Sequence, residues 1–173
     1  MTSHRTVEGK GSGVHPAEEI RYLLLAAQRE GNRYFTESLR PLGLTASQAE
    51  VLRVLQEHQP ITLRDLGRLL VCEYGSPSRL VSGMARAGLV ASAPSAEDGR
   101  AVTLSLTPLG AERAAQVVTI EAELDQQIMR LIQDIPIQPV MDLFWRYIEG
   151  RPAGQALARR TGRAVAPGQT TPR

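Results

Sequence analysis

The segment spanning residues 62–107 constrains the fold most, because two helix starts and a tight turn follow one another within it. Ser76-Pro77 is a strong start signal, since serine caps helix N-termini and proline is favoured at the first helical position. Asp98-Gly99 is a good turn dipeptide between residues 89–92 and 101–106, which have the composition of two strands. We therefore expect two short helices, a turn and a β-hairpin.

Helical periodicity extends on both sides of this segment. Thr45 and Thr62 each begin a capping-box sequence, with Gln48 and Asp65 three residues later. Ile61 is expected to form a short strand, and a last helix is expected from Pro139. Apolar residues recur at helical spacing in residues 17–40, 46–57, 63–71, 77–87 and 108–134. These elements predict a mostly α fold with a small β-wing, a winged helix-turn-helix.

Length and composition fit one globular domain of 173 residues, 42% hydrophobic and 22% charged. No apolar run approaches the roughly 18 residues of a membrane span, and no signal core precedes the first helix, so cytoplasmic residence without a membrane partner is expected. We expect a disordered N-terminal segment (1–15), a winged-helix domain (16–150) and a basic disordered tail (151–173). Within the domain, the DNA-binding lobe, which holds the short helices and the wing, is expected at 45–107.

Overall basicity is weak evidence for DNA binding in this chain, whose pI is about 9.0 and whose net charge is +2. Residues 150–173 hold five arginines and no acid, so the pI mostly describes the tail. The tail either adds non-specific affinity for DNA or is a solvated extension. Binding must therefore be argued from particular residues.

Four stretches carry a family resemblance: LRPLGLTASQAEVLRVL, TLRDLGRLL, SPSRLVSGMARAGLV and EDGRAVTLSLTPLG. In this order and spacing they resemble the multiple antibiotic resistance regulator (MarR) family, over residues 17–150. The resemblance implies a homodimeric transcription regulator that a small ligand or oxidant commonly releases from DNA. It places the dimerisation helices at 17–40 and 108–149. Family members usually have Asp-Arg-Arg at the wing where this chain has Asp98-Gly99-Arg100, and many have a basic residue near Ala91-Ser92. Fewer phosphate contacts are therefore expected.

Arg79 is the first candidate for reading bases, because it lies in the opening turn of the expected recognition helix and arginine pairs bidentately with guanine. Ser76 and Ser78 can donate to phosphates or bases, although capping is expected to occupy Ser76. Arg100 is expected to enter the minor groove, oriented by Asp98. For each residue the alternative is an ordinary solvated surface side chain. Further candidates for phosphate contact are Thr62, Arg64, Arg68, Ser82 and Arg86.

Cys72 is the only cysteine, and two interpretations of it remain open. It is either a redox switch beside the recognition helix or, as we favour, a small apolar residue packed at the end of the third helix. An enzyme using it as nucleophile would need a neighbouring base, and the sequence supplies none. Without a Cys/His cluster or a catalytic motif, we expect no metal, no cofactor and no enzymatic activity.

The sequence thus predicts a homodimer that binds double-stranded DNA at a pseudo-palindromic operator, as a repressor released by an unknown small-molecule effector or an oxidant. The alternative is a dimerisation or protein-interaction module with weak or lost DNA binding, favoured by the negative net charge of the chain outside its termini. Effector-cavity candidates, each with core packing or surface exposure as the alternative, are Tyr22, Arg29, Arg33, Tyr34 and His58.

Overall fold

The computed structural model describes residues 15–72, 76–95 and 101–164. It divides into two compact units, Met1–Tyr34 and Phe35–Arg173. The first unit holds most of helix α1 (Pro16–Leu39), whose exposed apolar side chains include Ile20 and Leu23. Among the described residues, no helix is both long and apolar enough to cross a membrane.

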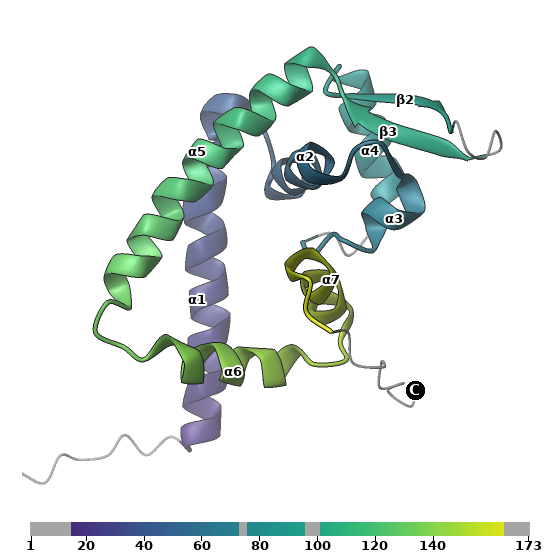
Figure 1. Cartoon of the computed structure of the whole chain (residues 1–173). Helices are drawn as coiled ribbons and strands as arrows, with labels where there is room; N and C mark the ends of the chain where they lie inside the picture. The colour runs from purple at the N-terminus through teal and green to yellow at the C-terminus, as the bar shows by residue number, and fades with distance from the viewer. Residues whose placement is uncertain (1–14, 73–75, 96–100, 165–173) are drawn as a thin grey trace, which may run out of the picture. The chain divides into compact units, whose positions relative to one another are not determined.

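The second unit carries all the remaining elements (Figure 1). They are η1 (Arg40–Leu42), α2 (Ala46–His58), β1 (Ile61–Thr62), α3 (Leu63–Gly67), α4 (Pro77–Arg86), β2 (Val90–Pro94), β3 (Val102–Leu106), α5 (Pro108–Leu131), α6 (Ile137–Ile148) and α7 (Pro152–Thr161). This order of helices around a small sheet confirms the mostly α fold with a β-wing.

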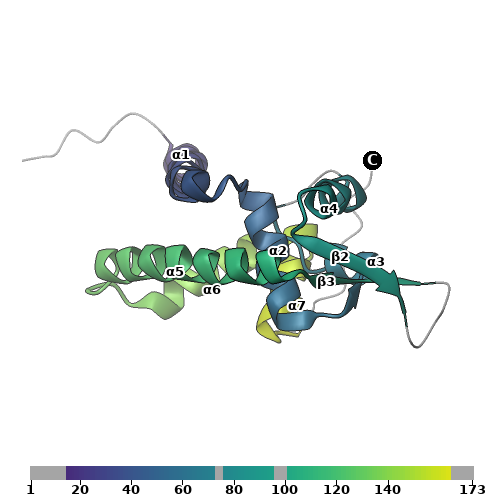
Figure 2. The ribbon, with the colours of Figure 1, turned by 90° about the horizontal axis from the view of Figure 1, so that it is seen from above.

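The sheet has three antiparallel strands in the order β1-β3-β2. Ile61 pairs with Leu104, and Val90 pairs with Leu106 at the base of the hairpin. The hairpin of β2 and β3 projects beyond the neighbouring helices (Figure 2). Its strands confirm the expected wing, whereas its tip, residues 96–100, lies outside the described residues.

The hydrophobic core is built around α2, which buries Leu52 and Leu55 completely. Leu66 of α3, Met84 of α4 and Val117 of α5 are also inaccessible to solvent, so each helix of the lobe contributes to one core. Burial of each such side chain contributes roughly 1.5–3 kcal/mol. The lobe is therefore a stable frame for the exposed faces of its helices.

Helix starts follow the capping signals of the sequence. Thr45 and Gln48 form the reciprocal capping box of α2, with bonds of 2.9 and 3.3 Å. Thr62 caps α3 by accepting from the Asp65 N–H at 3.1 Å. Among the described residues, Asp65 does not complete the expected capping box. Its carboxylate accepts from the Thr62 hydroxyl at 2.7 Å and not from the Thr62 backbone N–H.

Gly110 permits a close approach between α5 and the base of the wing. A Cβ at this position would clash with the carbonyl oxygen of Leu89, so only glycine fits. Beside it, the Thr107 hydroxyl donates to the Gly88 carbonyl at 2.6 Å and accepts from the Gly110 N–H at 3.0 Å. These contacts fix the wing to the start of α5.

The expectation of an unstructured tail over 151–173 is wrong for residues 152–161, which form α7. Its buried residues are all small, Gly154, Ala156 and Ala158, and a Cβ on Gly154 would clash with the Ile148 carbonyl. Such residues give little hydrophobic signal, so composition alone suggested disorder. Residues 1–14 and 165–173, also expected to be disordered, lie outside the described part of the chain.

Candidate nucleic-acid interface

Helix α4 has one buried and one polar exposed face. Val81 and Met84 are buried in the lobe, as the sequence pattern predicts. The exposed residues Ser78, Arg79, Ser82 and Arg86 recur every three or four positions and therefore lie on the opposite side. Among the described residues, the Arg79 guanidinium has no hydrogen-bond or ion-pair partner. Within that part of the chain, no side chain competes with an external acceptor for it.

The N-terminus of α4 differs in one detail from the expectation. Ser76 stands at the N-cap but makes no side-chain cap, so the expected capping role of its hydroxyl is wrong. Its oxygen lies 2.8 Å from the hydroxyl oxygen of Ser78, and its backbone carbonyl accepts from the N–H of Arg79 at 3.0 Å. Both hydroxyls are therefore held at a positive helix end, a suitable environment for a phosphate.

Helix α3 supplies a less basic surface than its sequence suggests. Arg64 is exposed, whereas Arg68 Nη1 is paired with Asp65 Oδ1 at 2.9 Å. The pKa of Asp65 is lowered, chiefly because Thr62 donates to it and then because of the charge of Arg68. Thr62 is occupied by this cap. Arg64 is therefore the phosphate candidate on α3 with an open side chain.

The strands of the wing flank the segment that holds the other two candidates. Ser95 N–H donates to the Ala101 carbonyl at 2.8 Å, which pairs the chain on either side of residues 96–100. Asp98 and Arg100 lie outside the described residues, so their roles at a minor groove stay predictions.

Comparison with known proteins agrees with this geometry. The family model described as "Winged helix DNA-binding domain" matches residues 44–110. The organic hydroperoxide resistance transcriptional regulator of Bacillus subtilis (strain 168) is 30% identical over 114 residues, which cover 66% of this chain and 78% of that protein. The repressor IacR of Pseudomonas putida is 24% identical over 100 residues, covering 58% of this chain and 60% of that protein.

Solved structures share the fold. A mutant MarR from E. coli complexed with operator DNA matches 78% of this chain and 99% of its own, at 24% identity and a TM-score of 0.67. The S. aureus MepR–DNA complex matches 74% and 95%, at 20% identity and a TM-score of 0.68. The chain belongs to the MarR family. It is therefore a DNA-binding transcription regulator, and the alternative of a module that has lost DNA binding is not supported.

The single thiol of this MarR-family protein lies in surroundings that disfavour its thiolate form. Cys72 is exposed, so the expectation that it packs as an apolar residue is wrong. Its pKa is nevertheless raised to about 11, first because its surroundings desolvate the thiolate and then because of the Glu50 carboxylate nearby, with Arg160 acting in the opposite direction. Since the thiolate is the reactive form, this environment opposes the redox-switch interpretation.

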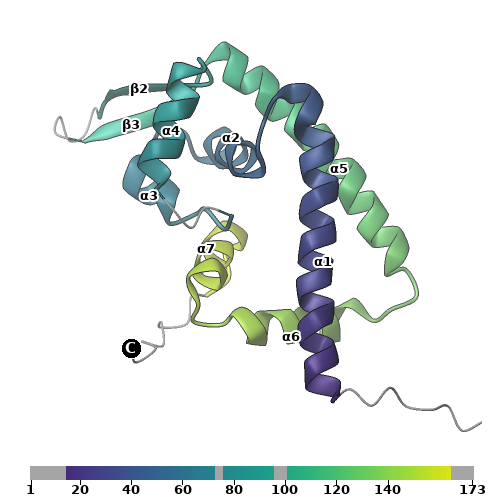
Figure 3. The ribbon, with the colours of Figure 1, turned by 180° about the vertical axis from the view of Figure 1, so that it is seen from behind.

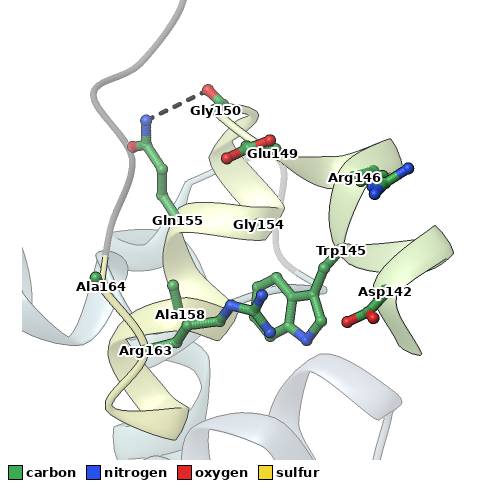
Figure 4. Close-up of a pocket in the computed structure, with 10 residues that line it drawn as sticks. All are labelled: Asp142, Trp145, Arg146, Glu149, Gly150, Gly154, Gln155, Ala158, Arg163 and Ala164. Carbon is green, nitrogen blue, oxygen red and sulfur yellow. Dashed lines mark hydrogen bonds between the residues drawn. The ribbon is translucent and has the colours of Figure 1, made fainter. Parts of the chain in front are cut away.

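A cavity of about 280 Å³ lies between α6 and α7 (Figure 4). The guanidinium of Arg163 stacks over the Trp145 ring, 4.5 Å from its centroid, and Gln155 donates to the Gly150 carbonyl at 3.3 Å. None of the five effector-cavity candidates lines this space. Sequence reasoning missed it because five of its lining residues belong to the supposed tail: Gly154, Gln155, Ala158, Arg163 and Ala164. The effector cavity expected between the dimerisation helices and the DNA-binding lobe stays a prediction.

Proposed function

We propose that the protein is a homodimeric repressor that reads a pseudo-palindromic operator with α4 in the major groove of each half-site. The observation that carries the proposal is the open polar face of α4, on which Arg79 has no partner among the described residues. Arginine can pair bidentately with guanine from such a position. Two recognition helices related by a two-fold axis would contact half-sites about 34 Å apart.

The apolar surface of α6 supports the homodimer. Leu143, Phe144 and Tyr147 are 59%, 46% and 55% exposed, and none of the residues of α6 is buried. A contiguous apolar face of this kind typically marks an interface with another protein surface. We infer that a second copy of the chain covers it, as the family relationship and the symmetry of operators both favour.

Repression is the simpler regulatory outcome, because a bound dimer blocks polymerase without any further contact surface. The similar protein from P. putida is named a repressor. We propose that a small-molecule effector, rather than oxidation of Cys72, releases the DNA, since the raised pKa of that thiol opposes its reaction. A regulator of transcription acts where the genome is, so cytoplasmic residence stays the prediction.

The test begins with selection of bound fragments from genomic DNA, followed by gel-shift titration with the selected operator. Arg79→Ala together with Arg100→Ala should weaken operator binding about a hundredfold or more, because two base- or groove-reading side chains are removed. Arg130→Ala, an exposed arginine of α5, removes one charge away from the recognition face and is the control. Unchanged affinity in the double variant would contradict the proposed recognition mode.

A further inference from the structure

Glu50 is a buried carboxylate in the middle of α2. It is 7% exposed and lies among the core residues of the lobe. Burying a carboxylate is costly unless hydrogen bonds and an opposite charge compensate it. Its partners are therefore informative about what the residue does.

Both oxygens of Glu50 accept from the backbone of the chain that follows α3. The N–H of Val71 donates to Oε1 at 2.7 Å, and the N–H of Cys72 donates to Oε2 at 2.8 Å. Because α3 ends at Gly67, these two donors have no partner in a continuing helix. The carboxylate takes the place of that helix and holds the segment that leads to α4.

The opposite charge comes from α7. Arg160 Nη1 lies 3.1 Å from Glu50 Oε1, and the Arg160 side chain is 26% exposed. The neighbouring Arg159 donates to the backbone carbonyl of Arg68 at 3.3 Å and does not contact Glu50. Figures 1 and 3 both place α7 beside α2 and the end of α3. Helix α7 therefore contacts both α2 and the residues that follow α3.

We propose that Glu50 and Arg160 are positioning residues for DNA recognition. Glu50 fixes Val71 and Cys72, which follow α3 on the way to α4, and Arg160 balances its charge from α7. This inference depends on the proposed reading of DNA by α4. A recognition helix must be held within about 0.5 Å of its productive position, so loosening its approach segment reduces operator affinity without removing any DNA contact.

The first experiment compares Glu50→Gln, Arg160→Gln and the matched control Arg159→Gln. The control removes the same charge from the same helix but leaves Glu50 untouched. We expect Glu50→Gln to weaken operator binding about tenfold, because the carboxamide can accept from only one of the two backbone N–H groups and carries no charge. Arg160→Gln should weaken it about threefold, as expected for a partly exposed ion pair, and Arg159→Gln by less than about twofold.

Binding to unrelated duplex DNA separates positioning from charge. Non-specific affinity depends on phosphate contacts, so Glu50→Gln should leave it unchanged while operator affinity falls. Equal losses on operator and unrelated DNA, or equal operator affinities for Arg160→Gln and Arg159→Gln, would overturn the proposal.

A second variant guards against simple unfolding. Glu50→Leu with Arg160→Leu replaces the ion pair by apolar side chains, a change that buried pairs often tolerate without loss of stability. We expect this variant to stay folded, to lose amide-exchange protection at Val71 and Cys72, and to bind operator as weakly as Glu50→Gln. Wild-type protection and wild-type operator affinity in this variant would overturn the proposal.

These measurements also distinguish failure of the inference from failure of the proposed function. If Arg79→Ala leaves operator affinity unchanged, recognition by α4 is wrong, yet exchange at Val71 and Cys72 still reports whether Glu50 fixes the segment. If Arg79→Ala weakens binding and the Glu50 variants do not, only the positioning role is wrong.

Discussion

Helices α4 and α6 are of similar length, 10 and 12 residues, and both are amphipathic, yet they leave opposite faces uncovered. Helix α4 buries Val81 and Met84 and exposes polar side chains. Helix α6 exposes Phe144 and Tyr147 and buries none of its residues. Amphipathicity therefore identifies a face, but the chemistry of the uncovered face identifies the class of partner.

The difference also shows which helix faces are covered within one chain and which need a partner. The inner face of α4 is satisfied within the lobe, so its polar face is available to DNA. No residue of α6 is buried within the chain, so its apolar face is uncovered, and a second copy of the chain is the partner we propose. Each helix can be altered on its exposed face without disturbing the lobe core, which makes the comparison testable.

The largest effect is expected on α6. Leu143→Asp with Phe144→Asp places two charges on the proposed interface, so we expect a monomer that binds a two-half-site operator about a thousandfold more weakly or worse. Sedimentation velocity gives the oligomeric state and gel-shift titration gives the affinity. Gln56→Asp adds a charge at an exposed position of α2, outside the helices assigned to dimerisation, and serves as the control. A persistent dimer in the Leu143–Phe144 variant would contradict the assignment of this face.

A smaller effect is expected within the exposed face of α4. Arg79→Ala should reduce operator affinity about 10- to 100-fold and relax the preference for one base pair, because it removes a base contact. Arg86→Ala should weaken operator and unrelated DNA alike and reduce the salt slope by about 1, because it removes a phosphate contact. Titrations on both DNAs at several salt concentrations check this. A uniform loss in Arg79→Ala would show that it, too, contacts only phosphate.

The smallest effect is expected at Cys72, whose thiol pKa depends on the charge of Glu50. The thiol pKa, raised to about 11 from an ordinary 9.0, should fall in Glu50→Gln because a nearby negative charge is removed. It should rise further in Arg160→Gln because a compensating positive charge is lost. Alkylation rates against pH report this single thiol directly. Shifts in the same direction for both variants would contradict the described charge arrangement.

Local signals in the sequence predicted most of the recognition lobe. The capping residue Thr45, the Ser76-Pro77 start and the alternation of residues 102–106 depend on neighbours a few positions away, and the structure confirms these elements. The sequence did not predict the ion pair between Glu50 and Arg160, which are 110 positions apart. Helix α7 was missed for a similar reason, because its buried residues are small and their burial depends on parts of the chain far away in the sequence.

Ser76 shows that residue type does not always predict the hydrogen-bond partner of a side chain. Residue type predicted a capping hydroxyl, but the structure pairs that hydroxyl with Ser78, a choice that depends on side-chain rotation rather than on sequence spacing. Asp98 and Arg100 stay predictions, as does the dimer. Asp98 and Arg100 lie outside the described residues, and the dimer involves a second copy of the chain.

The central claim is that α4, and not α6, meets the bases of the operator. Because Cys72 is the only native cysteine, a Cys72→Ser background allows one new thiol to carry an iron–EDTA group. We predict that Ser82→Cys in this background cleaves operator DNA at two symmetric major-groove positions, whereas Gln138→Cys, on α6, gives no such pattern. Absence of cleavage from position 82 in a bound complex, or equal cleavage from position 138, would contradict the claim.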